Sequence, residues 1–438
     1  MGHFRSIVLL FAANVVIISS LLIFMTGYFR STTRSSSAAL DDGEQYGGYT
    51  TGEPPFDKVI FMLVDALRSD FVYGEQSGFE FTQSLIQSGA AIPLTALAAL
   101  PTLTVSRLKA LTQGTAQSFL DAWVNVANSP DVIRLEGEDT WLSRLKSSRG
   151  YEKKLVFYGV DMWLDLYPDI FDRYEGFFGF YMPDITTLDA NISAQVPNEL
   201  RKDDWVSLVM HYENLDSLAH QGGLRSTHMR PKQTEMDNVV RMIYDGILHQ
   251  PHLRNTLLVL LGDHGMDEQG NHGGDTPGEL ASAMVLVSPN FKGKSRNYQV
   301  PMKPREDYKF YSVINQVDIV PTLAGLLDFD IPAANIGVFI PDVLDVFTST
   351  KQRLDVLMRN ARQMMRLANL TLTTNPDSPL IHTQGCEEYE AELEKLHCLW
   401  VRVTIAEKKW KDTNSLKPEA FRSAIDDVGH QERLSIVL

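Results

Sequence analysis

The sequence has 438 residues, of which 44% are hydrophobic and 22% are charged, and this composition excludes a wholly disordered or collagen-like chain. It contains 40 Lys and Arg against 55 Asp and Glu, so the net charge of −15 argues against nucleic acid as a partner. Two cysteines are too few for a disulfide scaffold. At about 150 residues per domain, the length fits two or three domains or one large α/β domain with insertions.

The first feature along the chain is an uncharged apolar run, Ile7–Met25. At about 1.5 Å per residue, a helix of this length nearly spans the roughly 30 Å hydrocarbon core of a membrane. We expect a retained transmembrane signal anchor within residues 1–30, with a cleaved signal peptide as the alternative. Arg5 precedes the run while Arg30 and Arg34 follow it, so charge does not predict the orientation. We expect no second membrane span, because no comparable apolar run follows.

The rest of the chain divides by composition into three parts. Residues 31–55 are rich in Ser, Gly, Thr and Pro and predict a flexible tether. Residues 56–344 alternate short apolar runs with amphipathic stretches, which is typical of one α/β domain. Residues 345–438 predict a helical tail that contains Cys386 and Cys398. A continuous helix would separate these cysteines by about 18 Å, beyond disulfide reach, so either the helix breaks or the thiols are free; we favour free thiols.

Three apolar segments predict buried parallel strands, and an aspartate follows each of them closely. The segments are Lys58–Val64, Trp205–Tyr212 and Thr256–Gly262, and the aspartates are Asp65, Asp216 and Asp263. Ligands of open α/β sheets bind beyond the carboxyl ends of the strands, so the three carboxylates would converge on one crevice. Aspartates also begin turns and cap helices, and this alternative stays open for each one taken alone.

Histidines near two of these aspartates favour a metal site. Asp216 and His220 are four residues apart, so on a helix they would share one face. His264 follows Asp263 directly, and His272 lies in a glycine-rich loop that can fold back tightly. Mixed imidazole and carboxylate ligands suit zinc. Six ligands are too many for one tetrahedral ion, so we predict two Zn²⁺, an arrangement that serves phosphoryl transfer.

A hydroxyl nucleophile is predicted in the segment Pro101-Thr-Leu-Thr-Val-Ser-Arg107, which precedes a helical pattern. A hydroxyl at a helix start can meet both a metal ion and the positive end of the helix. Metal coordination would activate it as a nucleophile. We favour Thr104, with Thr102 as the alternative. The spacing by itself also allows both residues to be helix caps only.

Together these motifs resemble those of the GPI ethanolamine phosphate transferases, a family within the alkaline phosphatase superfamily. The matching segments lie between about residues 56 and 344 and include VDALRSDFV, PTLTVSRLKALTQG, HYENLDSLAH, LLGDHGMDEQGNHGG and QVDIVPTLAGLLDFDIP. The segments PKQTEMDNVVRMIY and IPDVL are most similar to the branch that modifies the second mannose. The resemblance implies an alkaline-phosphatase-like α/β fold, with a mostly parallel sheet flanked by helices.

The resemblance also implies roles for the candidate site residues. Thr104 matches the nucleophile, Asp65, Asp263 and His264 match the ligands of the zinc beside it, and Asp216, His220 and His272 match the ligands of the second zinc. The implied reaction moves phosphoethanolamine from phosphatidylethanolamine to a mannose of the GPI precursor through a phospho-threonine intermediate. The implied location is the endoplasmic reticulum membrane, with the catalytic domain in the lumen and a small multi-pass membrane protein as a partner.

Several positions depart from the family pattern. The family usually has Gly, His and Gly where this chain has Asn214, Ser217 and Ala219, and a Pro where it has Ser106. Family members also continue into many membrane spans, for which this sequence shows no apolar runs. Two alternative functions therefore stay open. One is a hydrolase of the phosphodiesterase or nucleotide pyrophosphatase type on the same scaffold, and the other is a non-catalytic relative.

Five further polar residues have roles that the sequence suggests. His211 ends a predicted strand, and we expect a structural role for it. Arg68 and Arg107 could approach a phosphate or form salt bridges at helix starts. Asn191 and Asn369 fit the glycosylation sequon, and a glycan at either would place the domain in the lumen.

Overall fold

The computed structural model describes residues 53–115, 139–149, 152–179, 186–293 and 298–367, together with residues 4, 5, 10 and 13–21. The chain forms two compact units, one of Met1–Gly43 with Gln117–Ile133 and one of Glu44–Ala116 with Arg134–Leu438. In the first unit, residues 13–21 are helical and exposed. Across the described ranges, no helix combines the length and the apolar character that a membrane span requires.

Several predictions fall outside the described residues. These are most of the tether at 31–55, both cysteines (Cys386 and Cys398) and the sequon at Asn369. The predicted anchor, Ile7–Met25, is described only in part, as a helical stretch at residues 13–21. The signal anchor therefore stays a prediction.

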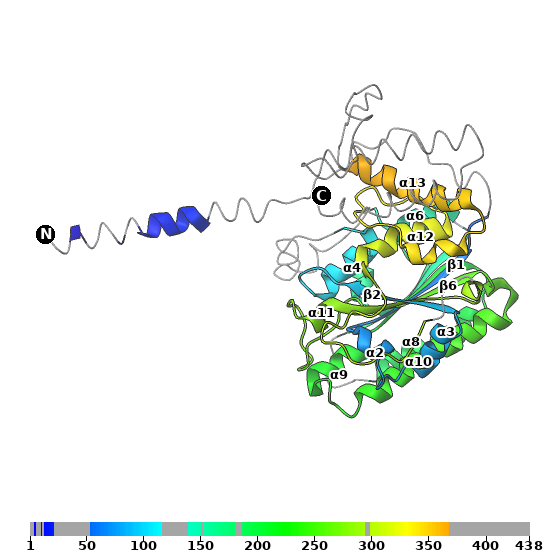
Figure 1. Ribbon diagram of the computed structural model, residues 1–438, viewed down its shortest axis with the longest axis horizontal. Helices are drawn as coiled ribbons and strands as arrows, with labels where there is room; N and C mark the ends of the chain where they lie inside the picture. Colours follow the sequence, from blue (N-terminus) through cyan, green and yellow to red (C-terminus); the bar gives the residue numbers. More distant parts are fainter. Residues whose placement is uncertain are drawn as a thin grey trace, which may run out of the picture. The chain divides into compact units, whose positions relative to one another are not determined.

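The second unit is built around an eight-stranded sheet with the order β4-β3-β5-β1-β6-β7-β2-β8 (Figure 1). The strands are β1 (Lys58–Val64), β2 (Ala91–Leu97), β3 (Lys154–Val160), β4 (Arg173–Phe177), β5 (Trp205–Tyr212), β6 (Thr256–Leu261), β7 (Ala281–Val287) and β8 (Ser312–Asn315). Within this sheet β7 alone runs opposite to the others, because it pairs antiparallel with both β6 and β2 while every other pair is parallel. The predicted α/β class with a mostly parallel sheet is confirmed.

The middle of the sheet is apolar on both faces. Every residue of β1, β5, β6 and β7 is buried, as their nearly uninterrupted apolar sequences predict. Lys58 is the charged exception in β1; its ammonium lies 4.9 Å from the centre of the Trp205 ring and pairs with Asp203 at the strand's amino end. The carboxyl ends of β5, β1 and β6 therefore lie side by side, and these are the ends that the predicted site requires.

Helices cover both faces of the sheet, as Figure 1 shows. One layer contains α4 (Thr104–Gln113), α6 (Trp141–Arg149), α12 (Ile319–Leu327) and α13 (Thr350–Leu367). The other contains α2 (Ser69–Tyr73), α3 (Glu80–Gln87), α8 (Thr187–Leu200), α9 (Asn214–Gly222) and α10 (Met229–His249). Shorter helices are α7 (Met162–Leu166), α11 (Pro277–Leu280), η2 (Pro251–Leu253), η3 (Pro289–Phe291), η4 (Gln316–Asp318) and η5 (Pro341–Val346). In the second layer, α10 packs against α3, α8 and α9.

The helix α13 begins the predicted helical tail and packs on the domain. Asn360 Oδ1 accepts a hydrogen bond from the backbone N–H of Phe339 at 2.9 Å. Arg359 donates to Asp328 at 3.1 Å, next to the end of α12. Residues 350–367 of the tail are helical, and the compact unit continues past the predicted boundary at residue 344. The helical tail over residues 345–438 stays a prediction.

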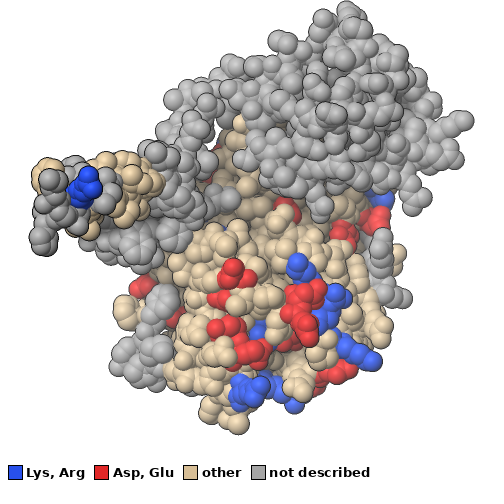
Figure 2. Space-filling model, turned by 60° about the vertical axis from the view of Figure 1, so that its left-hand side comes forward, with Lys and Arg blue, Asp and Glu red and all other residues tan. Residues whose placement is uncertain are grey.

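The surface of the second unit carries charges of both signs. On the face drawn in Figure 2, acidic and basic side chains are interspersed among uncharged ones. Some of them form exposed pairs, such as Arg305 with Asp307 at 3.0 Å.

Candidate active site

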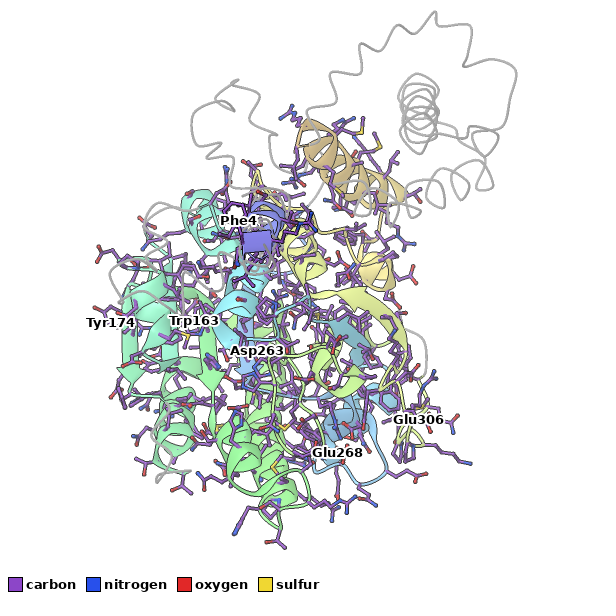
Figure 3. All side chains as sticks on the ribbon, turned by 90° about the vertical axis from the view of Figure 1, so that its left-hand side faces the viewer. Phe4, Trp163, Tyr174, Asp263, Glu268 and Glu306 are labelled. Atoms are coloured by element: carbon purple, nitrogen blue, oxygen red, sulfur yellow. The ribbon has the colours of Figure 1, made fainter. Side chains whose placement is uncertain are left out.

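The three predicted aspartates meet at one edge of the sheet. Asp65 directly follows β1, Asp216 lies in the first turn of α9 after β5, and Asp263 follows β6 by two residues. They are almost completely buried, with exposed fractions of 1%, 3% and 0%. Figure 3 marks Asp263 inside the second unit. Because β5, β1 and β6 are neighbours in the sheet, the strand order itself brings the three carboxylates together.

The candidate metal ligands form two groups. One group is Asp65, Asp263 and His264, the other is Asp216, His220 and His272, and in each group one ligand atom per residue lies within 4.8 Å of the others. His264 Nε2 lies 3.4 Å from Asp65 Oδ1 and 3.3 Å from Asp263 Oδ2. Asp216 Oδ2 lies 3.2 Å from His220 Nε2, and its Oδ1 lies 3.6 Å from His272 Nε2. The rings of His264 and His272 stack with centroids 4.0 Å apart, so the two groups are adjacent.

The orientation of these ligands fits metal binding. Asp65 Oδ1, Asp216 Oδ1 and Asp263 Oδ2 are buried and have no hydrogen-bond partner among the described residues. Leaving such oxygens unpaired in a protein interior is costly, unless a cation binds them. The carboxylate and imidazole donors of both groups are the ones that zinc takes.

Backbone carbonyls orient two of the imidazoles. His264 Nδ1 lies 2.9 Å from the carbonyl oxygen of Gly265, and His272 Nδ1 lies 2.8 Å from that of Thr102. Each Nδ1–H therefore donates to a carbonyl, which leaves the Nε2 lone pair free to face its group. This is the usual arrangement of a metal-binding histidine.

The charges of the site also favour a cation. Burial, followed by the neighbouring carboxylates of Asp263 and Asp216, raises the pKa of Asp65 well above its usual range. Burial lowers the pKa of His272, so its imidazole is held in the neutral form that binds metals. A hydrogen bond with Asp216 raises the pKa of His220. A divalent cation between these groups would relieve the repulsion among the carboxylates.

Thr104 is the hydroxyl that faces these ligands. It is the first residue of α4, and its Oγ1 lies 3.4 Å from Asp65 Oδ2 and 3.4 Å from His264 Nε2. The alternative hydroxyl, that of Thr102, instead donates to the carbonyl oxygen of Gly274 at 2.9 Å and accepts from the N–H of Gly273 at 2.8 Å. The hydroxyl of Thr102 therefore holds the glycine-rich loop, and its carbonyl holds His272.

Comparison with known proteins agrees with the motifs. The family model for Type I phosphodiesterase / nucleotide pyrophosphatase matches residues 131–312. A protein of Aspergillus fumigatus named GPI ethanolamine phosphate transferase 2 is 43% identical over 388 residues, which are 89% of this chain and 50% of that protein. This chain is related to the GPI ethanolamine phosphate transferases. The resemblance inferred from the motifs is therefore confirmed.

Other transferases of the same name are similar over most of this chain. That of Aspergillus oryzae is 39% identical, with 89% of this chain and 47% of that protein covered. That of Schizosaccharomyces pombe is 34% identical, with 86% and 49% covered. The chain thus spans about half the length of these curated relatives.

Two solved structures are more weakly similar. A putative sulfatase from Bacteroides thetaiotaomicron gives a TM-score of 0.49 at 16% identity, covering 65% of this chain and 73% of that one. Murine ectonucleotide pyrophosphatase / phosphodiesterase 5 gives 0.44 at 12% identity, covering 62% and 95%.

His211 contacts Asp65, one of the candidate metal ligands. It is fully buried, its Nδ1 accepts from Trp163 Nε1 at 2.9 Å, and its Nε2 lies 3.3 Å from Asp65 Oδ2. Burial lowers the pKa of His211 to about 4, so the ring is neutral and Nε2–H donates to Asp65. The expected structural role is thus a specific one, namely orientation of a candidate ligand. The strand register could have revealed it, since His211 pairs with Leu63, two residues before Asp65.

The two arginines that sequence analysis singled out have different surroundings. Arg68 donates to both carboxylate oxygens of Asp70 and to Glu268, so it forms salt bridges near the start of α2. Arg107 lies one helical turn after Thr104 and is 1% exposed. Its Nε and Nη2 have no hydrogen-bond partner in the part of the chain that the structure describes. Burial lowers the pKa of Arg107 to about 10, so the side chain is still charged at neutral pH.

Three of the four residues that depart from the transferase pattern lie on α9, and the fourth, Ser106, lies on α4. Asn214, Ser217 and Ala219 are all buried. Ala219 packs against Gly270, which has a φ of +83°, and a Cβ on that glycine would lie 2.1 Å from the Ala219 carbonyl oxygen. A glycine is therefore required here to bring the loop that carries His272 against α9.

Proposed function

We propose that this chain carries the catalytic domain of a zinc-dependent phosphoethanolamine transferase that acts on a mannose, the second one, of the GPI precursor. The position of the Thr104 hydroxyl carries this proposal, because Oγ1 lies 3.4 Å from both Asp65 Oδ2 and His264 Nε2. The names of the relatives supply the transferred group and the class of acceptor.

Two groups of residues would hold the metal ions. Asp65, Asp263 and His264 would bind one Zn²⁺, and Asp216, His220 and His272 would bind the second. When bound, the zinc ions would lower the pKa of an attacking hydroxyl and neutralise charge on the phosphoryl oxygens. His211 would keep Asp65 oriented toward its group throughout.

Thr104 would act as the nucleophile in the first half of the reaction. Its Oγ attacks the phosphorus of phosphatidylethanolamine, and the bond from phosphorus to the diacylglycerol oxygen breaks. Diacylglycerol leaves with a proton equivalent to the one that Thr104 loses, and phosphoethanolamine is left esterified to Thr104. In the second half, a mannose hydroxyl attacks the same phosphorus, the bond to Thr104 breaks, and the proton of that hydroxyl restores the threonine.

Positive charge near Thr104 would stabilise the phosphoryl group during both steps. Thr104 is the first residue of α4, whose N-terminal end attracts anions. Arg107 places a buried guanidinium in the same turn, and two of its nitrogens have no hydrogen-bond partner among the described residues. A phosphoryl oxygen is the type of acceptor that an unpaired buried guanidinium binds well.

The substrates also imply where the enzyme works. Phosphatidylethanolamine and the GPI precursor are membrane lipids, so we propose that the domain is held at the endoplasmic reticulum membrane by the anchor within residues 1–30. We place the domain in the lumen and include a small multi-pass membrane protein as a partner. Asn191 lies exposed on α8, where a glycan would report the lumenal orientation.

A hydrolase on the same scaffold is the second candidate function. The family model that matches residues 131–312 favours it, since its description names a phosphodiesterase and a nucleotide pyrophosphatase. The chemistry at Thr104 would be shared, and water would replace the mannose hydroxyl in the second step. A non-catalytic relative is the third, and the changed residues Asn214, Ser217 and Ala219 on α9 favour it.

The test follows a labelled head group. The full chain is loaded with zinc and supplied with phosphatidylethanolamine labelled in its ethanolamine and with a GPI mannoside acceptor. We expect label on the acceptor, and we expect a labelled peptide containing Thr104 when the acceptor is left out. Label released as free phosphoethanolamine in the presence of acceptor would favour the hydrolase.

Two substitutions make the test specific. Thr104→Ala is expected to retain both zinc ions and to lose all transfer, because only the nucleophile is removed. Thr234→Ala, the same substitution at an exposed position of α10, is the matched control and is expected to transfer normally. Normal transfer by Thr104→Ala would disprove the assigned nucleophile. A chain that binds no zinc would disprove the metal assignment.

A further inference from the structure

The helix α9 carries two of the three candidate ligands of the second metal group, Asp216 and His220. The backbone N–H groups at a helix start need acceptors. Glu213, the residue before α9, makes no capping hydrogen bond with its own side chain. Asp216 could cap the helix from its third position, but its carboxylate oxygens instead lie 3.2 Å from His220 and 3.6 Å from His272.

The cap is supplied by Asp189 of α8, the neighbouring helix. Asp189 Oδ1 accepts from the backbone N–H of Glu213 at 3.2 Å and from that of Asn214 at 3.3 Å. Its Oδ2 pairs with Lys232 of α10 at 3.3 Å, and Lys232 also pairs with Glu235 at 2.8 Å. The start of α9 is thus tied to both helices beside it.

This connection is closed to solvent. Asp189 is 0% exposed and Lys232 is 4% exposed. A buried carboxylate at the positive end of a helix is stabilised by the helix dipole and by its cationic partner. Removing the charge of Asp189 takes one of two acidic partners away from the buried ammonium of Lys232. A buried charge with less compensation is unfavourable.

We infer that Asp189, held by Lys232, is a positioning residue for the second metal group. It fixes the first turn of α9, and so it fixes the place where Asp216 and His220 present their ligand atoms. Ligand atoms of such a site must be held to within about 0.5 Å, which a loosened first turn would not achieve. The inference rests on the proposed function, because that proposal supplies the metal ions.

The chain contains a matched control for this inference. Asp237 of α10 caps α3 in the same manner, since its Oδ2 accepts from the backbone N–H of Phe81 at 2.7 Å and its Oδ1 from that of Thr82 at 2.9 Å. Asp237 is also buried, at 4% exposed. The residues of α3 are Glu80–Gln87, and none of them belongs to either metal group. Asp237→Ala therefore removes the same kind of buried cap at a distance from the ligands.

The experiment is a Zn²⁺ titration of the full chain, of Asp189→Ala and of Asp237→Ala, together with amide hydrogen exchange of the metal-free proteins. We expect Asp189→Ala to weaken one of the two zinc sites by about 10- to 100-fold and to leave the other unchanged. We also expect faster exchange in residues 213–222. Asp237→Ala should keep both affinities and show faster exchange in α3.

Three outcomes would overturn the inference. They are unchanged binding of both zinc ions by folded Asp189→Ala, unchanged exchange in α9, or an equal loss in Asp237→Ala. If Asp189→Ala does not fold, Lys232→Met serves in its place, because it removes the ion pair and keeps the acceptor oxygens. A parent chain that binds no zinc would overturn the proposed function, while the exchange of α9 would still test the role of Asp189.

Discussion

Replacing His211 with phenylalanine tests whether the support behind Asp65 matters to the site. The substitution keeps a buried ring of similar size and removes both of its polar atoms. Trp163 Nε1–H then loses its acceptor, and Asp65 Oδ2 loses one of its two donors and keeps Thr104 Oγ1 at 3.4 Å. We expect the domain to lose stability and the metal group that contains Asp65 to bind zinc more weakly.

The magnitude follows from the two groups that lose partners. The unpaired N–H of Trp163 costs about 1–3 kcal/mol and the lost hydrogen bond to Asp65 about 0.5–1.5 kcal/mol, so the two together cost about 1.5–4.5 kcal/mol of the free energy of unfolding. Loss of a residue that orients a metal ligand weakens metal binding by about 10- to 100-fold, or about 1.4–2.8 kcal/mol. Both effects are large against a typical domain stability of about 5–15 kcal/mol.

Urea unfolding of the metal-free full chain measures the first effect, and a zinc titration measures the second. In the double variant with Trp163→Phe, the indole donor is absent, so the total loss should be smaller than the sum of the single losses by about 1–3 kcal/mol. His252→Phe is the control, because His252 bonds a backbone carbonyl away from the ligands and should lose about 1 kcal/mol or less. Additive losses in the double variant, or unchanged zinc binding by His211→Phe, would refute the reasoning.

Three further predictions concern other parts of the domain. Arg107→Met should slow transfer by about 10²- to 10³-fold. Its free energy of unfolding should hold or rise, because the variant removes a buried charge that has no partner for two of its nitrogens among the described residues. A lower free energy of unfolding together with slower transfer would contradict this. Gly270→Ala should lower the free energy of unfolding in urea by about 3 kcal/mol or more, because its Cβ would overlap the Ala219 carbonyl oxygen. Gly293 also has a positive φ, but a Cβ there meets no described atom within 4 Å, so Gly293→Ala should cost about 1 kcal/mol. Equal costs would be evidence against the overlap with Ala219. Burial would raise the pKa of Glu199, but hydrogen bonds from Arg173, Lys202 and Tyr158 outweigh it and lower this pKa. Ionised Glu199 therefore stabilises the fold above its unfolded pKa of about 4.3, and this stabilisation is lost as the pH falls through its lower folded pKa. Arg173→Met should flatten this acid dependence in unfolding measured from about pH 5 to 3, and an unchanged slope would contradict it.

Much of the site could be predicted from the sequence because its parts depend on local patterns. Apolar runs such as Lys58–Val64 predict buried strands, and side chains that follow such strands meet at one edge of a parallel sheet. The structure places Asp65, Asp216 and Asp263 at that edge. Thr104 begins a helix, as the pattern of its segment predicts. The candidate nucleophile could not be chosen from spacing alone, because Thr102 and Thr104 differ only in which hydroxyl faces the candidate ligands.

The remainder was decided by contacts between residues that are far apart in the chain. No local pattern predicts that β7 runs antiparallel between β6 and β2, or that α13 packs beyond residue 344. Nor does the neighbourhood of Asp189 in the sequence indicate that it caps α9. Local preferences determine which segments become strands, turns and helix starts, because neighbouring residues set the backbone and the apolar face. Which buried polar groups become partners depends on strand register and helix packing, and these are settled only when the whole core closes.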